Sequence, residues 1–332
     1  MDFYKSREAA GKIFWDYQLW LEQFRAKPSG SDHYRALRRQ VWKSTTKIVQ
    51  DGEYISCNGM SVSFDQEMIS KAWLETVFHP DTREIKIRDN NKYNSMECFA
   101  IKADCLETSR LLQLAGYNPA VLNMANRHNP GGWVQGGSGA QEENIFRRST
   151  AFCSLFQFVP YAQEYEIPLH QEHGYPIPRE SGGIYSPHLL VFRSSETTGY
   201  YLLDSPYSID LITVPAINKP NTETVNSMLQ IARYLIEPSK EKIRAILRIG
   251  FFHGNDALVL SAFGCGAFAN PPEHMASLFR EVLDEEEFRN AFRLIVFAII
   301  DDHNAHRRHN PEGNLLPFQR EFNRCLDIDA DI

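Results

Sequence analysis

Residues 120–144 of this sequence read AVLNMANRHNPGGWVQGGSGAQEEN. The apolar run Ala120–Met124 is typical of a buried strand, and five glycines then fall within the nine positions from Gly131 to Gly139. In α/β sheets, ligands bind where a strand ends and a helix begins, because backbone N–H groups and the positive helix end converge there. Glycine permits positive φ and a close approach of ligand to backbone. We therefore interpret this loop as a site for phosphate or ribose, with an ordinary flexible connection as the alternative.

The rest of the chain alternates helical and strand-like segments. Helical periodicity predicts helices at Ile13–Phe24, Tyr34–Val49, Cys105–Ala115, Ser138–Phe156, Asn221–Gly250 and Pro272–Leu283. Strands are expected at Tyr54–Phe64, Glu84–Ile87, Glu97–Ile101, Ala120–Met124, Leu189–Arg193, Tyr200–Asp204, Leu211–Pro215, Ala257–Phe263 and Leu294–Ile300. This order predicts the α/β class, with a mostly parallel or mixed sheet covered on both faces. Without a repeat or a linker-like run, we expect one domain with an N-terminal helical extension rather than two domains.

A second glycine loop follows a second strand. The sequence SAFGCGAFANPP, Ser261–Pro272, matches the G-x-G-x-x-[GA] dinucleotide pattern through Gly264, Gly266 and Ala269. That pattern belongs on the first strand–helix turn of a Rossmann fold, whereas this loop comes late in the chain. We therefore interpret it as a diphosphate loop, with Phe268 either stacking on the ligand or packing in the core. The hypothesis that the protein is an NAD-dependent oxidoreductase rests on this match alone.

The first loop ends in three polar residues, Gln141, Glu142 and Glu143. Ser138 and Gln141 also fit a helix capping box, and acids in a first turn complement the helix dipole, so a purely structural interpretation stays open. Carboxylates beside a phosphate-binding loop can instead act as acid or base on the sugar that the phosphates carry. Because the dipole lowers a glutamate pKa, a catalytic acid here would need burial and a like charge to raise it.

Composition excludes several classes of protein. The chain has 332 residues, 35 Lys and Arg against 42 Asp and Glu, and a net charge of −7. Its longest apolar run is the seven residues Leu294–Ile300, far below the roughly 18 that a membrane helix needs. The N-terminal stretch MDFYKSREAAGKIFWDY lacks the apolar core of a signal peptide. We expect a soluble protein of the cytoplasm, or of the nucleus in a eukaryote, without general nucleic-acid binding, so that any phosphate recognition is local.

Cysteine and histidine usage gives no clear metal site. The six cysteines contain no C-x-x-C pair and are expected to be reduced thiols; they are Cys57, Cys98, Cys105, Cys153, Cys265 and Cys325. Asp301, Asp302, His303, His306 and His309 could suggest a metal site, but the polar residues among them favour a solvated loop. We expect no metal and no cofactor.

With these motifs the chain resembles the microbial-type poly(ADP-ribose) glycohydrolases of the macrodomain superfamily. That family carries Gly-Gly-Gly, a short spacer and Gln-Glu-Glu, where this chain has Gly131-Gly132-Trp133, seven residues and Gln141-Glu142-Glu143. The resemblance continues in GGIYSPHLLVF (182–192), LITVPAIN (211–218), HGNDALVLSAFGCGAFANPP (253–272) and FRLIVFAI (292–299). It implies a three-layer α/β/α macrodomain at residues 81–332, behind a helical extension at residues 1–80.

The resemblance also implies a reaction and a ligand. An enzyme of this family hydrolyses the ribose O-glycosidic bond of poly(ADP-ribose) or of ADP-ribosylated targets, acting as a monomer on modified macromolecules. By this resemblance Glu143 would protonate the departing group and then activate water, and Glu142 would hold the distal ribose hydroxyls. The remaining substrate-binding residues would be Asn126, Gly131, Gly132, Trp133, Gln141, Gly264, Cys265, Gly266, Ala267 and Phe268. An oxocarbenium-like centre beside a diphosphate needs such fixed amides and a protonated carboxyl.

One position departs from the family motif. Trp133 replaces the third glycine and adds a large ring where the backbone is expected to approach ligand. We expect Trp133 to restrict the cleft and to shift preference from internal polymer linkages toward terminal or single ADP-ribose units. A macrodomain that only binds ADP-ribose, as a reader, is the alternative from another functional class. Retention of both Glu142 and Glu143 favours the enzyme, because a reader needs no acid.

Overall fold

The computed structural model describes residues 13–26, 31–87 and 92–323. Cys325 and the first 12 residues of the N-terminal stretch therefore lie outside the described residues. The helices are α1 (Tyr17–Arg25), α2 (Ser31–Asp51), α3 (Gln66–Leu74), α4 (Cys105–Leu114), α5 (Gln141–Arg148), α6 (Ala151–Leu155), α7 (Ile236–Phe252), α8 (Pro272–Leu283) and α9 (Leu315–Phe322). The strands are β1 (Glu53–Ile55), β2 (Ser61–Ser63), β3 (Val77–His79), β4 (Glu97–Ile101), β5 (Pro119–Met124), β6 (Gly183–Arg193), β7 (Leu202–Val214), β8 (Thr222–Val225), β9 (Met228–Ile231), β10 (Ala257–Leu260) and β11 (Leu294–Ala298).

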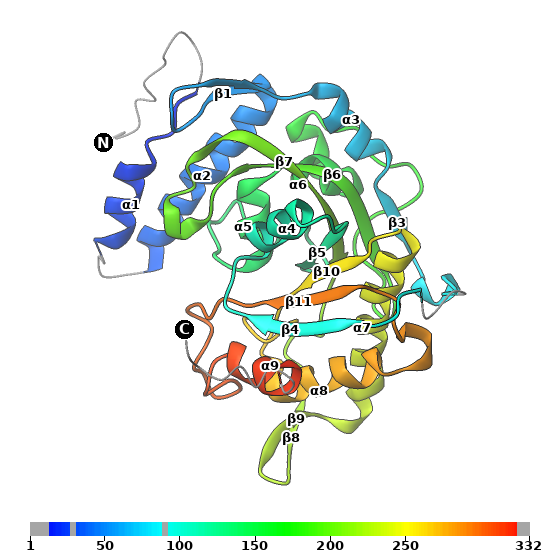
Figure 1. The fold of residues 1–332 in the computed structure, drawn as a ribbon. Coiled ribbons are helices and arrows are strands. Elements are labelled where there is room, and N and C mark those ends of the chain that lie inside the picture. Colours follow the sequence, from blue (N-terminus) through cyan, green and yellow to red (C-terminus); the bar gives the residue numbers. More distant parts are fainter. Residues whose placement is uncertain (1–12, 27–30, 88–91, 324–332) are drawn as a thin grey trace. The chain divides into compact units, whose positions relative to one another are not determined.

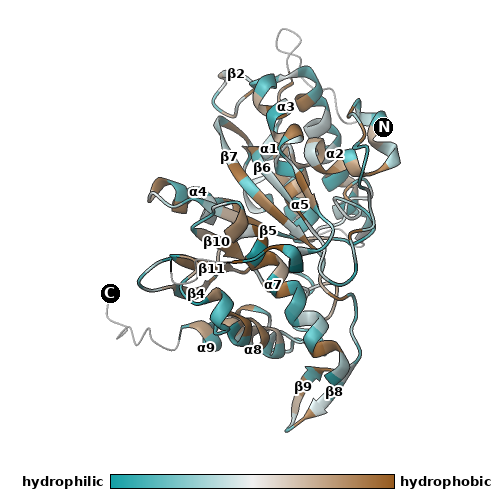
Figure 2. Ribbon diagram, turned by 90° about the vertical axis from the view of Figure 1, so that its right-hand side faces the viewer, coloured by the Kyte–Doolittle hydropathy of each residue, from teal (hydrophilic) through white to brown (hydrophobic). Residues whose placement is uncertain are grey.

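A seven-stranded sheet has the order β3-β6-β7-β5-β10-β11-β4 (Figure 1). The neighbours from β7 through β5, β10 and β11 to β4 pair in parallel, and β3 pairs with β6 in antiparallel orientation. The sheet is therefore mixed and flanked by helices, which confirms the predicted fold class. Parallel strands buried on both faces need apolar runs; β10 is hydrophobic along its length (Figure 2), and β5 is mostly apolar but contains the buried Asn123.

Side-chain alternation divides the central strands between two apolar layers. Leu258 of β10 and Ile295 of β11 belong to a large cluster with residues of α7, α8 and α9. Their neighbours Ala257 and Leu294 belong to a smaller cluster on which Leu112 of α4 packs. Because successive strand residues point to opposite faces, these two clusters are the two covered faces of the sheet.

Contacts within the chain define two compact units. The first contains Met1–Thr76, His128–Pro176 and Ser186–Ile209, and the second contains Val77–Arg127, Ile177–Tyr185 and Asp210–Ile332. The first unit therefore holds α1, α2, α3, α5 and α6, and the second holds α4, α7, α8 and α9. The expected boundary between residues 80 and 81 stays a prediction.

Several predicted elements are wrong in extent. No strand forms at Glu84–Ile87, where Asp81 instead caps a 3₁₀ turn and the N–H of Ile85 donates to Thr82. The predicted helix 138–156 starts at Gln141 and divides into α5 and α6. The strands expected at 200–204 and 211–215 are one strand, β7, while the segment 54–64 divides into β1 and β2.

The helix expected after Asn221 begins only at Ile236. The intervening residues form the hairpin β8–β9, which extends away from the sheet in Figure 1. Asn226 and Ser227 both have positive φ at its two-residue turn. This is the turn chemistry that matches the twist of a hairpin, so local backbone preference overrides helical periodicity here. Helix α9 was not predicted.

Among the described residues, no helix is long and apolar enough to cross a membrane.

Candidate active site

Two carboxylates of α5 converge on the middle of the first glycine loop. Glu142 Oε1 accepts the backbone N–H of Gly131 at 3.0 Å, and Glu143 Oε1 accepts that of Trp133, also at 3.0 Å. Gly132 lies between these two bonds, and a Cβ at this position would contact both carboxylates. Glu142 is only 4% exposed and Glu143 only 7%. The first unit thus brings these acids against the Gly-Gly-Trp segment, directly after the half-buried Gln141.

Each glycine of this loop also lies close to another group of the protein. A Cβ on Gly131 would come within 2.6 Å of the Phe146 ring, and one on Gly136 would overlap the ring of Trp133. The last two glycines adjoin α2. A Cβ on Gly137 would clash with the Arg35 carbonyl, and one on Gly139 would clash with the Arg38 guanidinium. The sequence interpretation assigned these glycines to ligand approach, yet the fold alone already favours glycine at Gly131, Gly132 and Gly137, where φ is positive and a Cβ would clash.

The backbone donors of the loop are largely committed as well. The N–H groups of Gly132, Val134, Gly136, Gly137 and Ser138 donate to carbonyls between residues 129 and 134. With the two N–H groups bound to glutamates, the loop is therefore held by its own hydrogen bonds. Trp133, whose side chain is 57% exposed, lies under the Arg35 guanidinium at 5.2 Å from the ring centroid.

The expected capping box at Ser138 and Gln141 does not form. The N-cap residue of α5 is Ala140, whose side chain makes no capping bond, so Ser138 lies two residues too early. The Ser138 carbonyl instead accepts from Arg147 Nη1 at 2.7 Å. Capping therefore does not explain the acids at the start of this helix.

The second unit places two further predicted segments at one edge of the sheet. Half-buried Asn126 follows β5, and the loop from Ser261 follows β10. Because β5 and β10 are parallel neighbours, both segments leave the carboxyl edge of the sheet side by side.

The loop after β10 is held by one buried amide. Asn270 Nδ2 donates to the carbonyls of Ile217 at 2.8 Å and Gly264 at 3.0 Å, and also contacts that of Phe268 at 3.3 Å. The backbone N–H of Lys219 donates to the same Phe268 carbonyl. Gly264 has φ +76°, and a Cβ there would meet Asn270 at 2.6 Å. These contacts fix the loop to the segment that follows β7.

Free backbone donors distinguish this loop from the first one. Within the described ranges, the N–H groups of Gly266, Ala267 and Phe268 donate to no protein group. A run of unsatisfied backbone N–H groups is a concave anion site. Phe268 is half-buried and packs on the main apolar cluster.

Cys265, between the two loop glycines, is fully buried. Its Sγ lies 3.6 Å from the Phe263 carbonyl, and burial raises the pKa of this thiol far above its ordinary value. A thiol held in its neutral form is a poor nucleophile, so Cys265 serves as a small buried side chain.

The histidines after β11 have backbone and amide partners. His309 Nε2 lies 2.8 Å from the Cys265 carbonyl, and His306 Nδ1 lies 3.2 Å from the Pro311 carbonyl. In the part of the chain that the structure describes, no three His, Cys, Asp or Glu side chains are placed to hold a metal ion.

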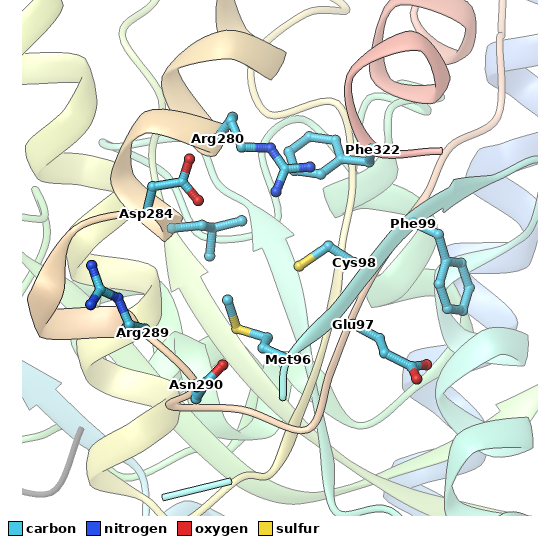
Figure 3. A pocket seen from close by; sticks show the side chains of 10 residues that line it. Met96, Glu97, Cys98, Phe99, Arg280, Asp284, Arg289, Asn290 and Phe322 are labelled. Atoms are coloured by element: carbon cyan, nitrogen blue, oxygen red, sulfur yellow. The ribbon is translucent and has the colours of Figure 1, made fainter. Parts of the chain in front are cut away.

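A cavity of about 580 Å³ lies beside the edge strand β4, within the second unit. Figure 3 shows Arg280 of α8 and Asp284, which follows this helix, facing Met96 and Cys98 across it. Its lining residues come from the start of β4, from the end of α8 and the segment after it, and from α9, and they include none of the predicted site residues. The cavity is therefore separate from both glycine loops.

Comparison with known proteins supports the resemblance to the microbial-type PARG family. Residues 43–194 match the model of the microbial-type PARG catalytic domain, where PARG is poly(ADP-ribose) glycohydrolase. Over these residues the chain is similar to the microbial-type PARG catalytic domain. The matched range of this PARG domain contains the Gly-Gly-Trp segment and both glutamates, but neither residues 1–42 nor the loop after β10. No curated protein matches the chain.

Solved structures extend the likeness to PARG over most of the chain. PARG from Thermomonospora curvata is 25% identical, with a TM-score of 0.64, and the match covers 86% of this chain and 99% of that one. PARG from Deinococcus radiodurans in complex with ADP-ribose is 28% identical, with a TM-score of 0.57, over 76% of this chain and 96% of that one. These comparisons therefore support a PARG-type hydrolase that acts on glycosidic bonds.

Proposed function

We propose that this protein releases ADP-ribose by hydrolysing the ribose O-glycosidic bond of poly(ADP-ribose) or of ADP-ribosylated targets, with Glu143 as general acid and then base. The observation that carries the proposal is the burial of Glu143 against the family motif. Its Oε1 already accepts the Trp133 N–H. A proton on this carboxyl therefore belongs on Oε2, from which it can pass to the departing oxygen. The same oxygen then accepts a proton from water.

Glu142 has a different role in this proposal. It is held by Gly131 through Oε1, and its other oxygen adjoins Gly132. We assign Glu142 to the hydroxyls of the distal ribose, together with Asn126, while Gly131, Gly132, Trp133 and Gln141 shape the surroundings of the scissile bond. A fixed acceptor of hydroxyl hydrogens orients the sugar for in-line attack by water.

The loop after β10 is assigned to the diphosphate. The free N–H groups of Gly266, Ala267 and Phe268 support this role, since they can neutralise phosphate oxygens without a basic side chain. Gly264 and Cys265 form the turn that presents these donors, and Phe268 packs on a sugar at its exposed edge. An acidic protein can bind a diphosphate in this way.

A mono-ADP-ribosyl hydrolase is the second candidate, because Trp133, whose backbone N–H donates to Glu143, carries an exposed ring. The test is the release of ADP-ribose from poly-ADP-ribosylated and from singly modified protein by the wild type and by Glu143→Ala. We expect release by the wild type and loss in the variant. ADP-ribose binding without release from either substrate would contradict the enzyme and favour a reader.

A further inference from the structure

Helix α2 packs against the first glycine loop at two of its glycines. The Arg38 guanidinium carbon lies 2.5 Å from where a Cβ on Gly139 would be, and the Arg35 carbonyl blocks a Cβ on Gly137. Both arginines precede residue 43, where the match to the PARG catalytic domain begins. The loop that carries the family motif is therefore supported by a segment outside the matched domain.

Arg38 is the first member of a buried hydrogen-bond network. Its Nε and Nη2 donate to the two carboxylate oxygens of Glu196 at 2.7 and 2.8 Å. The side chains are 12% and 21% exposed, so this two-point ion pair is largely screened from water. Glu196 Oε2 also accepts the hydroxyl of Tyr200 at 2.9 Å.

Tyr200 connects this network to α5. Its hydroxyl oxygen accepts Asn144 Nδ2 and Arg147 Nε, both at 3.0 Å. A phenol has one donor and two acceptor positions, and all of them are occupied here. Arg147, which is fully buried, then donates from Nη1 to the Ser138 carbonyl. The network thus holds both the end of the loop and the helix that begins with the two glutamates.

We propose that Arg38 is a positioning residue for the glycosidic hydrolysis, acting through Glu196 and Tyr200 on the helix that carries Glu143. This inference rests on the proposed role of Glu143. Arg38 fixes the loop at Gly139 and fixes α5 at Asn144 and Arg147, so that the carboxylates stay against Gly132. Displacement of a catalytic group by about 1 Å can cost roughly 10²-fold in rate, even when the change lies far from the bond that breaks.

The test compares Arg38→Met and Tyr200→Phe with Val41→Ala. Val41 is fully buried on the same helix but makes no part of the network, so its truncation controls for loss of stability alone. We expect kcat for ADP-ribose release to fall about tenfold or more in both network variants, with KM changed by less than about twofold. Arg38→Lys should restore little, because an ammonium cannot replace the planar two-point donor. The double variant should be no slower than the slower single variant.

Hydrogen exchange of the peptide 131–148 gives a readout that does not depend on activity. We expect faster exchange there in Arg38→Met and Tyr200→Phe than in Val41→Ala at matched thermal stability. If the wild type is inactive but the two network variants still exchange faster, the proposed hydrolysis is refuted. The inference that Arg38 holds the loop in place would then still stand. Unchanged exchange, or a kcat no lower than that of Val41→Ala in an active protein, would overturn the role of Arg38.

Discussion

Glu143 and Trp133 are joined by a hydrogen bond of 3.0 Å from the backbone N–H of the tryptophan to Oε1 of the glutamate. One carboxylate oxygen is thereby committed to the loop, and in the proposed mechanism the other carries out proton transfer. The same residue can thus gain and lose a proton at Oε2 while its bond to the loop persists. A carboxyl group in which one oxygen binds the loop and the other transfers the proton is suited to act as acid and then as base.

The first prediction concerns Glu143→Gln. The amide oxygen can still accept the Trp133 N–H, so we expect the fold and ADP-ribose affinity to be kept, while kcat falls by about 10²- to 10⁴-fold because no proton can be transferred. Rates of ADP-ribose release and calorimetric binding of ADP-ribose check this. A variant with more than about a tenth of wild-type kcat would exclude Glu143 as the acid.

The second prediction concerns the departure from the family motif. In Trp133→Gly the backbone N–H that binds Glu143 is kept, but the ring that lies under Arg35 is lost. We expect release from internal polymer linkages to rise relative to release from singly modified protein. Product lengths from polymer, measured beside release from singly modified protein, decide this. The same product pattern on both substrates as in the wild type would refute a role of Trp133 in selectivity.

The third prediction concerns the loop after β10. Asn270→Ala removes the buried amide that holds the carbonyls of Ile217, Gly264 and Phe268. We expect a loss of about 1–3 kcal/mol in stability, since the Ile217 carbonyl loses its amide partner. ADP-ribose affinity should fall by about tenfold as the free N–H groups lose their alignment. Thermal unfolding measures the loss of stability, and calorimetric titration measures the affinity for ADP-ribose. If the variant binds ADP-ribose as tightly as the wild type, Asn270 does not align the loop for binding.

The fourth prediction concerns acid stability of the second unit. His79 Nε2 and His253 Nε2 face each other at 3.0 Å, and Tyr185 stacks on His253. Burial lowers the pKa of both imidazoles from 6.5 to about 4, and for His253 the neighbouring His79 adds to the shift. The unfolded chain therefore binds more protons between these values, so stability is full above pH 6.5 and declines as the pH falls toward 4.

Both imidazoles are only half-buried, so we expect a decline on the order of 1–2 kcal/mol for the pair. His79→Gln can still donate to His253 but does not titrate, and it should flatten the decline by about half. Urea unfolding at pH 7.5, 5.5 and 4.5 for both proteins provides the comparison. If the free energy of unfolding falls equally with pH in the wild type and in His79→Gln, the histidine pair does not contribute to the acid sensitivity.

The sequence predicted the central part of the fold because its strands are short, apolar and bounded by clear turn residues. The helix expected at Pro272–Leu283 has the observed bounds, since Pro272 is favoured at the first helical position. The strand Glu97–Ile101 likewise agrees with β4. Errors occurred where backbone conformation rather than periodicity decides the outcome, as at the positive φ of Asn226 and Ser227.

The candidate site was only partly accessible from sequence. The acids and glycines could be named, because their spacing forms a motif, but their mutual contacts depend on tertiary structure. Asn270 was missed because a single asparagine before two prolines carries no distinctive signal. Arg38 was missed for a similar reason: its partner Glu196 is 158 positions away in the chain, and no local pattern reports such a pair.

The committed hydrogen bonds of the first glycine loop have a consequence for the thermodynamics of binding. A loop whose N–H groups already donate to Glu142, Glu143 and its own carbonyls has little conformational freedom left to lose when a ligand arrives. The entropic penalty of association should then come mainly from the ligand itself, whose ribose and pyrophosphate torsions must be frozen. A glycine-rich sequence, commonly equated with flexibility, thus codes here for a preorganised surface.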